Sequence, residues 1–223
     1  MEKYYRELAQ AGDEQAIAEA IYHANQLDWK GGVNEWIHVF DAALKMSRYK
    51  LCGALLDVRG EMSIESDFYL GWVSQNEGDY FLSLARYENA RREYLESITA
   101  YNKVLALTPD DPAAHNNRGN ALQSLGDLQA KLSQHNDAMQ SYNAAILACS
   151  KALALAPDYV AAHRNKGNAL KILGDLQAQL SQHDEAVKSW QVALAEASRV
   201  LEIAPNDKYA KALMHEIQSR LAE

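Results

Sequence analysis

Apolar residues between positions 110 and 157 form two stripes with the three- and four-residue spacing of an α-helix, one on each side of a polar turn at 133–135. Asp111 followed by Pro112 is a typical helix start, because aspartate accepts hydrogen bonds from free backbone amides and proline fits the first helical turn. Pro157 prevents the second helix from continuing. The pattern therefore predicts two antiparallel helices. They are expected at about 112–132, with Leu122, Leu125, Leu128 and Leu132, and from Asn136 or Asp137 to about Leu155, with Ala138, Tyr142, Ala145, Cys149 and Ala152.

The same landmarks recur every 48 residues along most of the chain. Segments 110–157 and 158–205 align without a gap, and segment 62–109 follows the same frame more loosely. A fixed period of this kind predicts three stacked helix pairs that pack on their neighbours instead of forming separate cores. The repeated positions include Pro109, Pro157 and Pro205; Gly71, Gly119 and Gly167; Gly78, Gly126 and Gly174; and Asp79, Asp127 and Asp175.

The two ends of the chain depart from the period. Segment 206–223 has apolar residues every four positions behind Asn206 or Asp207 as a helix cap, which predicts an amphipathic capping helix with a solvated outer face. Segment 1–61 predicts either a helical cap over the first repeat or a separate adaptor region that docks a partner. Its helical patterns lie near 3–10, 13–26 and 34–57, with expected breaks at Gly12 and at Lys30-Gly31-Gly32.

Composition narrows the class of protein. The net charge of −8 is spread along 223 residues without a basic tract, which argues against nucleic acid as a partner. No stretch approaches 18 apolar residues, so we expect neither a membrane span nor a membrane partner. Cys52 and Cys149 lie outside any metal-binding spacing, and free thiols are typical of a reducing compartment. We therefore expect a cytoplasmic protein without a metal or other cofactor.

Small, aromatic and proline residues stand at matching places in the two closely related repeats. They are Gly119 and Gly167 in segments 115–122 and 163–170, Ala138 and Ala186, Tyr142 and Trp190, and Pro157 and Pro205. These residues resemble the tetratricopeptide repeat (TPR) family over about positions 62–223. The resemblance implies an all-α fold, a right-handed α-solenoid of antiparallel helix pairs. It also implies a non-enzymatic scaffold for protein–protein interaction, which binds a peptide or partner domain in a concave groove lined by the first helix of each pair.

The period is longer than the 34 residues typical of the family. The 14 extra residues divide into one heptad for each helix, and a heptad returns an apolar stripe to nearly the same face. Each helix should then reach about 20 residues, or roughly 30 Å. Gly126 and Gly174 fall inside the first helices, where glycine costs about 1 kcal/mol relative to alanine. This predicts either close helix contact or a kink at these positions, or simple tolerance of the glycines.

The resemblance also indicates which residues line the groove. They are Asn117 and Asn120 in the second repeat, Arg164, Asn165, Asn168 and Lys171 in the third, and Phe68, Tyr69 and Trp72 in the first, with Asn116 and Gln123 as flanking candidates. Carboxamides both donate and accept, so the rows Asn117/Asn165 and Asn120/Asn168 suit the backbone of an extended peptide. The two cations favour an acidic partner, and the aromatic residues would form an apolar end.

Other interpretations of the same residues stay open. Asparagine and lysine on an exposed helix face are often only solvated, and Trp72 could belong to the core under the N-terminal region. The family's two-carboxylate clamp is not reproduced. The repeated His115/His163 and His135/His183 are expected to be structural, and no catalytic motif occurs, so we expect no enzymatic activity. The alternative function is a structural, assembly or regulatory subunit, whose long helices and N-terminal region self-associate into a homo-oligomer or dock on an effector protein.

Overall fold

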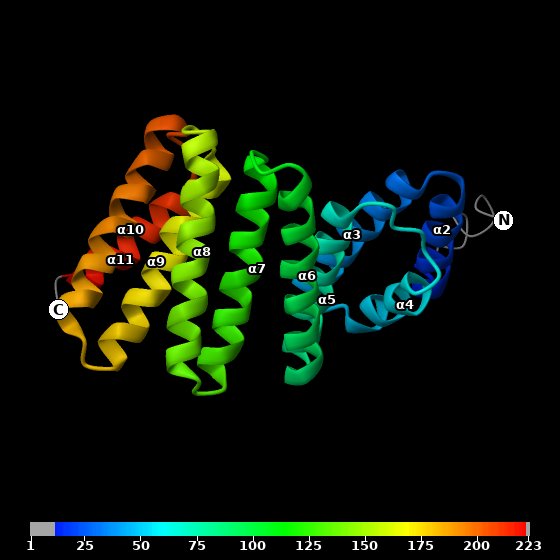
Figure 1. Cartoon of the computed structure of the whole chain (residues 1–223). Helices are drawn as coiled ribbons and strands as arrows, with labels where there is room; N and C mark the ends of the chain where they lie inside the picture. Colours follow the sequence, from blue (N-terminus) through cyan, green and yellow to red (C-terminus); the bar gives the residue numbers. More distant parts are fainter. Residues whose placement is uncertain (1–11, 222–223) are drawn as a thin grey trace. The chain divides into compact units, whose positions relative to one another are not determined.

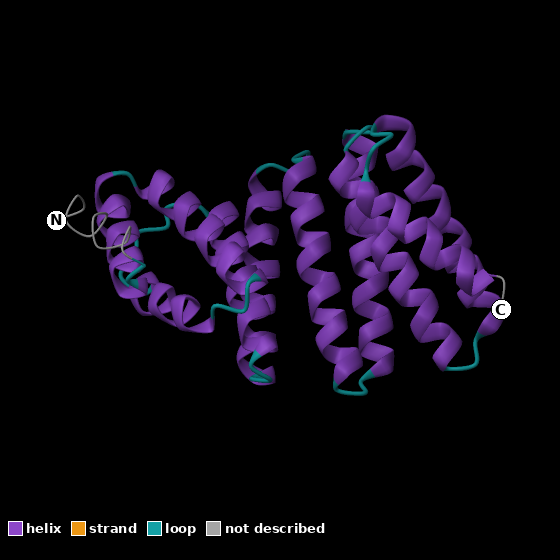
Figure 2. Cartoon of the chain, turned by 180° about the vertical axis from the view of Figure 1, so that it is seen from behind, coloured by secondary structure: helices purple, strands orange, loops and turns teal. Residues whose placement is uncertain are grey.

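Helices joined by short turns make up the part of the chain that the computed structural model describes, residues 12–221, and this part contains no strand (Figure 1; Figure 2). The chain divides into an N-terminal unit, residues 1–100, and a C-terminal unit, residues 101–223. The expected helix near 3–10 lies outside the described residues. The helices are α2 (Glu14–Leu27), α3 (Trp29–Lys45), α4 (Tyr49–Arg59), α5 (Asp67–Ser83), α6 (Tyr87–Leu107), α7 (Pro112–Lys131), α8 (His135–Leu155), α9 (Val160–Gln179), α10 (His183–Ile203) and α11 (Lys208–Leu221).

The helix boundaries in the N-terminal unit differ from the sequence prediction. The expected break at 30–32 is wrong, because α3 begins at Trp29 behind Asp28, whose side chain accepts from the Lys30 amide at 3.2 Å. Gly32 allows close contact between α2 and α3, since a Cβ there would overlap the backbone of Asn25. The single helix expected at 34–57 is interrupted at 46–48, where Ser47 adopts a φ of 56°.

One hydrophobic core joins the helices α2 to α5 of the N-terminal unit. Trp36 and Phe40 of α3 stack with ring centroids 4.4 Å apart, and the Trp36 indole donates to the Leu55 carbonyl at 2.9 Å. Beside this core, burial raises the pKa of Glu77 to about 7, although the Arg59 guanidinium lies 2.7 Å away. The N-terminal helices therefore share their core with α5, the first helix of the first predicted repeat.

Within the described residues, the C-terminal unit contains the last turns of α6, the helix pairs α7–α8 and α9–α10, and α11 (Figure 1). The helix expected at about 112–132 is confirmed, and Asp111 caps it by accepting from the amides of Ala113 and Ala114. The second helix begins at His135 and not behind Asn136 or Asp137, and Gln134 precedes it without a side-chain cap. Asp207 caps α11 as expected, accepting from the Ala210 amide at 2.8 Å.

Glycines inside the first helices mark places of close helix contact. A Cβ at Gly126 would lie 2.7 Å from Cε1 of Tyr142, and one at Gly174 would lie 2.6 Å from Nε1 of Trp190. The prediction of close contact is therefore confirmed at both glycines. The ring that each glycine accommodates also donates a hydrogen bond to the following aspartate, at 2.8 Å to Asp127 in α7 and at 3.0 Å to Asp175 in α9.

Candidate functional site

A chain of side-chain amides connects α7 to α9 in the C-terminal unit. Asn165 donates to the side-chain oxygen of Asn116 at 3.0 Å, and Asn116 donates to that of Asn117 at 3.2 Å. Asn117 in turn hydrogen-bonds Tyr101, whose pKa burial raises well above its usual value. Both predicted groove residues of this row are therefore engaged: Asn165 joins α9 to Asn116 of α7, and Asn117 joins α7 to Tyr101 of α6.

The other predicted row of amides is not engaged in this way. Asn120 of α7 is exposed and Asn168 of α9 is half-buried. Among the described residues, neither side chain has a hydrogen-bond or ion-pair partner. A carboxamide with unused donors and acceptors can pair with a peptide backbone. The two predicted rows thus differ: Asn117 and Asn165 have internal hydrogen-bond partners, whereas the amides of Asn120 and Asn168 are unpaired within the described part of the chain.

Both cations of the predicted groove have acidic partners within the C-terminal unit. Arg164 pairs with Asp207, the buried cap of α11. Lys171 lies 3.2 Å from a carboxylate oxygen of Asp175, and 3.1 Å from one of Glu216. A carboxylate ligand would have to compete with these three acidic side chains. The positive charge of Arg164 and Lys171 is therefore largely balanced before any ligand binds.

The sequence prediction did not include these acidic partners. The (i, i+4) spacing of Lys171 and Asp175 is typical of helix ion pairs and could have suggested one of them. Asp207 was expected only as a helix cap, while its pairing with Arg164 and the approach of Glu216 to Lys171 depend on how α11 packs on α9. That packing cannot be read from local sequence.

The aromatic candidates Phe68, Tyr69 and Trp72 lie in α5 of the N-terminal unit, whereas both asparagine rows belong to the C-terminal unit. The Tyr69 ring packs edge-on against Trp29 at 5.6 Å, and its hydroxyl accepts from the Asn34 side chain at 3.4 Å. Phe68 contacts Tyr69 edge-on at 6.1 Å. Trp72 is 36% exposed and makes an edge contact with His38 at 6.4 Å. Tyr69 is thus part of the packing against α3, while Trp72 stays accessible.

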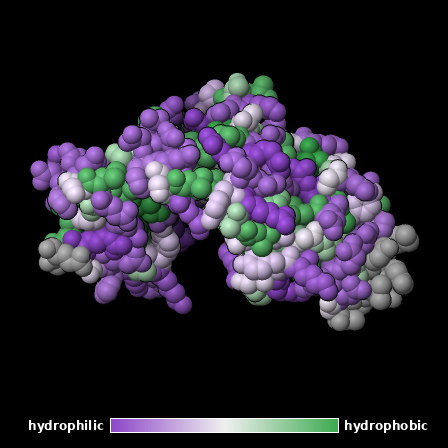
Figure 3. All heavy atoms as spheres, turned by 90° about the horizontal axis from the view of Figure 1, so that it is seen from below, coloured by the Kyte–Doolittle hydropathy of each residue, from purple (hydrophilic) through white to green (hydrophobic). Residues whose placement is uncertain are grey.

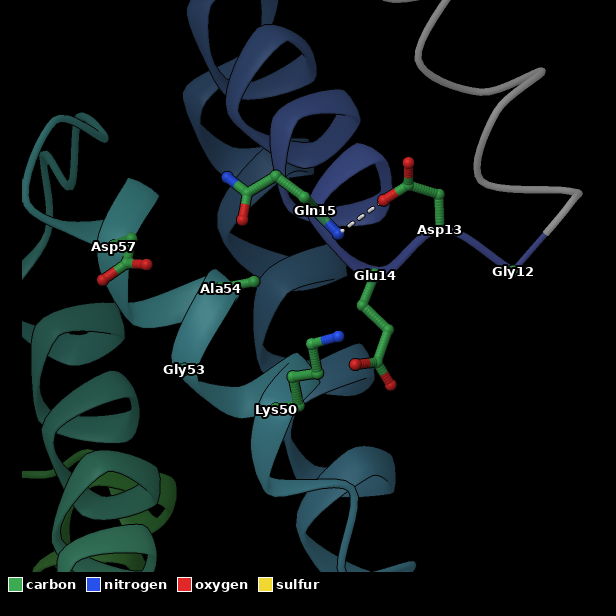
Figure 4. A pocket seen from close by; sticks show the side chains of 8 residues that line it. All are labelled: Gly12, Asp13, Glu14, Gln15, Lys50, Gly53, Ala54 and Asp57. Carbon is green, nitrogen blue, oxygen red and sulfur yellow. Dashed lines mark hydrogen bonds between the residues drawn. The ribbon is translucent and has the colours of Figure 1, made fainter.

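A pocket of about 500 Å³ lies at the start of α2, with charged side chains in its lining (Figure 4). It is lined by Asp13, Glu14, Lys50 and Asp57 and by small residues of α4. Asp13 accepts from the Gln15 amide at 3.0 Å, as a helix cap does, and Glu14 pairs with Arg48 at 3.0 Å. The acidic groups nearest the helix start are therefore engaged in structure.

The histidine, cysteine and acidic side chains of the described residues lie dispersed and form no metal-binding cluster. Within residues 12–221, no group of three or more His, Cys, Asp and Glu side chains is placed to hold a metal ion. Burial raises the pKa of the Cys52 thiol to about 11 and of the Cys149 thiol to about 12, so both stay protonated at neutral pH. None of the described helices is long and apolar enough to cross a lipid bilayer.

One stretch of the chain matches the TPR family, which the sequence pattern predicted. A family model described as a TPR repeat matches residues 88–126. No curated protein sequence matches the chain. The match covers most of α6 and the greater part of α7, which are successive second and first helices of the predicted repeats.

Three solved structures are similar to the chain over most of its length. BtubC (BKLC) from P. vanneervenii is similar over 99% of this chain and 87% of its own, with a TM-score of 0.55 at 14% identity. A thermophilic TPR protein of Thermus thermophilus is similar over 92% of this chain and all of its own, with a TM-score of 0.39 at 17% identity. The first TPR of Spaghetti (RPAP3), bound to an HSP90 peptide, is similar over 70% of this chain and 99% of its own, with a TM-score of 0.43 at 22% identity.

Together with the helix pairs, the likeness to BtubC shows the fold, and the family match supports the TPR family. The chain is an all-α protein that resembles TPR solenoids.

Proposed function

We propose that the chain is a non-enzymatic scaffold that binds an extended segment of a partner protein across α7 and α9. The observation that carries this proposal is the pair of unengaged amides, Asn120 and Asn168, on neighbouring first helices. An amide that donates and accepts can bind successive backbone groups of a peptide without reading its side chains. The neighbouring Asn165–Asn116 hydrogen bond supports this function by fixing the two helices relative to each other before a ligand binds.

Acidic partner segments fit this face through exchange of ion pairs. Arg164 is 41% exposed at its side chain, so a ligand carboxylate can approach it while Asp207 holds its other side. Glu216, with a side chain that is 51% exposed, is a surface partner of Lys171 that a ligand can replace at small cost, because exposed ion pairs contribute little. The preference for acidic ligands is therefore secondary to recognition by the amides.

The repeat organisation belongs to the same proposal. We take residues 62–109, 110–157 and 158–205 as three TPR-like repeats with one heptad added to each helix, residues 1–61 as a helical cap, and 206–223 as a capping helix. The helix lengths of 20, 21, 20 and 21 residues from α7 to α10 support the added heptads. The core shared by α2 to α5 supports a cap rather than an independent adaptor. The buried free thiols fit a reducing compartment such as the cytoplasm.

The decisive experiment removes the two unengaged amides, and its control removes one exposed amide from α8. Peptides selected from a phage-displayed random library on the wild-type chain are measured by isothermal titration calorimetry against the double variant Asn120→Ala/Asn168→Ala. We expect at least a tenfold loss of affinity with an unchanged thermal midpoint, because neither side chain has an internal partner.

The matched control is Asn143→Ala, which removes an exposed amide from α8. We expect this variant to bind the selected peptides as tightly as the wild type does. Equal affinity of the wild type and the Asn120→Ala/Asn168→Ala variant would refute the proposed face.

A second function, self-association through the long helices, is favoured by one observation. Apolar side chains are exposed along α8 and α10, with Leu147 at 59%, Leu155 at 42% and Val192 at 45% exposure. On the face shown in Figure 3, hydrophobic residues occur in small groups among hydrophilic ones. Light scattering on the purified chain tests this function, because a homo-oligomer held by these residues should dissociate when Leu147 and Val192 are changed to glutamine.

A further inference from the structure

A second pocket lies on the C-terminal unit, away from the proposed peptide-binding face. It encloses about 440 Å³ between the last turns of α6 and α8 and the first turns of α7. Arg118 and Lys151 line it together with His115 and a single acidic residue, Asp110. Its remaining walls are Asn102 and the apolar residues Leu105, Pro109, Ala154 and Leu155. The pocket thus carries a surplus of positive charge on a protein whose net charge is −8.

Two buried nitrogens of this pocket, one on His115 and one on Arg118, lack a partner within residues 12–221. One ring nitrogen of His115, Nε2, lies 2.8 Å from the Pro109 carbonyl and therefore donates to it, which leaves Nδ1 as an acceptor. His115 is only 8% exposed, and Nδ1 has no hydrogen-bond partner among the described residues. The buried Nε of Arg118 is also without one, and the described residues provide no ion pair for Arg118 or Lys151. Buried polar groups without partners are rare in proteins and need an explanation.

The equivalent place in the next helix pair shows what is absent. His163 makes the same contact, with Nε2 2.8 Å from the Pro157 carbonyl, but its Nδ1 lies 2.6 Å from a carboxylate oxygen of Glu196. The other carboxylate oxygen of Glu196 lies 2.7 Å from Nζ of Lys166, which stands 48 positions after Arg118. One carboxylate therefore binds both the histidine and the cation of α9.

Two glutamates of α10 are replaced by alanine in α8. Ala148 stands where α10 has Glu196, and Ala154 stands where it has Glu202. Glu202 lies 2.7 Å from Arg199, the counterpart of Lys151, and Asp158 lies 2.8 Å from the same guanidinium. In α9–α10 each of these cationic groups thus has a carboxylate, whereas α7–α8 keeps the cations and the histidine but has lost both glutamates.

We infer that the pocket around His115, Arg118 and Lys151 binds a glutamate or aspartate side chain of a partner protein, at the place where α9–α10 holds Glu196. The occupant is an acidic residue with an aliphatic neighbour, because Leu105 and Leu155 line the same pocket. The carboxylate accepts from Arg118 and from Nδ1 of His115, which takes up a proton from solvent as the ligand binds, because Nε2 stays bonded to the Pro109 carbonyl. Glu196 occupies the corresponding place beside Lys166 and His163. This site is independent of the Asn120/Asn168 face, and either can fail without the other.

The test supplies the carboxylate first on an added peptide and then on a glutamate introduced into α8. The probe is the N-acetylated and C-amidated peptide Gly-Leu-Glu-Leu-Gly, with Gly-Leu-Gln-Leu-Gly as its uncharged match. On binding the first peptide, the ¹⁵N shift of Nδ1 of His115 should move from that of an acceptor nitrogen to that of a protonated one. The glutamine peptide should leave it unchanged. Glutarate serves as a free carboxylate, and we expect it to bind at least tenfold more weakly than the glutamate peptide, because it lacks the leucines.

Ala148→Glu places an internal carboxylate where Glu196 stands in α10. We expect this variant to lose at least tenfold in affinity for the glutamate peptide and to show the protonated Nδ1 signal without any ligand. The control Asn143→Glu adds the same charge to an exposed position of α8 and should bind as the wild type does. Arg118→Gln provides a second variant with the same expected loss, should Ala148→Glu fail to fold. Equal binding of the two peptides to the wild type, or undiminished binding to Arg118→Gln, would overturn the inference.

Discussion

The helix pairs α7–α8 and α9–α10 have the same length and the same start points within their repeats, yet they treat charge in opposite ways. In α9–α10, acidic side chains satisfy the cations. In α7–α8, Asp110 and Asp127 keep the acidic residues of positions 158 and 175, whereas the other equivalent places hold histidine, uncharged residues or cations without a carboxylate partner among the described residues. The pairs of α9, α10 and α11 are His163 and Lys166 with Glu196, Arg199 with Asp158 and Glu202, Arg164 with Asp207, and Lys171 with Asp175 and Glu216.

This difference indicates that residues shared by the repeats and residues that vary between them have different structural roles. Gly126 and Gly174 let the helices of each pair approach closely, and the aromatic ring beside each glycine donates the same hydrogen bond to the following aspartate in both pairs. The variable positions decide whether polar groups are satisfied internally or left for a partner. Binding sites in this chain should therefore be sought where one repeat lacks a partner that its neighbour provides.

The largest difference between the pairs is expected at Gly119 and Gly167, where the two first helices meet different neighbours. A Cβ at Gly119 would lie 2.7 Å from Sγ of Cys149 and 3.2 Å from the Ala145 carbonyl, whereas the nearest atom to one at Gly167 would be Cδ2 of Leu213 at 3.2 Å. Gly119→Ala should lower the free energy of unfolding by about 2 kcal/mol, since overpacking outweighs the gain in helix propensity. Gly167→Ala should be neutral or stabilise by up to about 1 kcal/mol. Urea unfolding monitored by circular dichroism measures both.

A second-site change tests the cause of this difference. Cys149→Ala copies Ala197, the residue at the same place in α10, and removes the sulfur that Gly119→Ala would contact. The double variant Gly119→Ala/Cys149→Ala should recover at least about 1 kcal/mol relative to the sum of the single changes. Additive effects would mean that the contact with Cys149 is not the source of the cost.

The next difference concerns Asp127 and Asp175, which accept the same hydrogen bond but differ in their other contacts. Burial raises the pKa of Asp127, against the hydrogen bonds from Tyr142 and Gln123. A carboxyl whose folded pKa is raised stabilises the fold fully below its unfolded pKa, and this stabilisation disappears as the pH rises through the folded pKa. Asp127→Asn should therefore raise the free energy of unfolding at neutral pH by about 1 kcal/mol and flatten its dependence on acidic pH.

Asp175→Asn should act in the opposite direction. Asp175 lies 2.5 Å from Nε of Arg220 and 3.2 Å from Lys171, so an amide in its place loses two ion pairs. We expect a loss of about 1 kcal/mol at neutral pH, reduced by salt because the side chains are partly exposed. Asp137→Asn, at an exposed position of α8, is the control for the loss of one charge. Destabilisation of the same size by Asp127→Asn and Asp175→Asn would contradict the assignment.

The sequence predicts the repeated part of the structure better than the variable part. Helix α7 was expected within a residue of its bounds, because Asp111 and Pro112 act through local backbone geometry. The close contact at Gly126 followed from a glycine that has no other local reason to stand inside a helix. The break expected at Gly31 and Gly32 was wrong for the opposite reason, since Gly32 serves close packing on Asn25 and not a turn.

The candidate site was predicted as a set of residue types and not as a set of contacts. Which asparagine is engaged depends on the distance between α7 and α9, and the pairing of Arg164 and Lys171 depends on the place of α11. Neither follows from helical periodicity. An alignment of the repeats places Ala148 opposite Glu196, and this difference could have indicated the pocket at His115. Positions that the repeats share do not reveal it.

The smallest difference is expected where the two pairs agree. Ser141 of α8 donates to the side-chain oxygen of Gln129 at 2.7 Å, and Ser189 of α10 donates to that of Gln177 at the same distance. Replacing either serine by alanine removes one neutral hydrogen bond and should cost about 1 kcal/mol. Ser141 is buried and Ser189 half-buried, so Ser141→Ala should cost only a few tenths of a kcal/mol more. Urea unfolding of the two variants measures this difference. Nearly equal costs would show that both pairs form this hydrogen bond in an equivalent way. A gap beyond about 1 kcal/mol would mean that the shared frame itself is packed differently in α7–α8 and α9–α10.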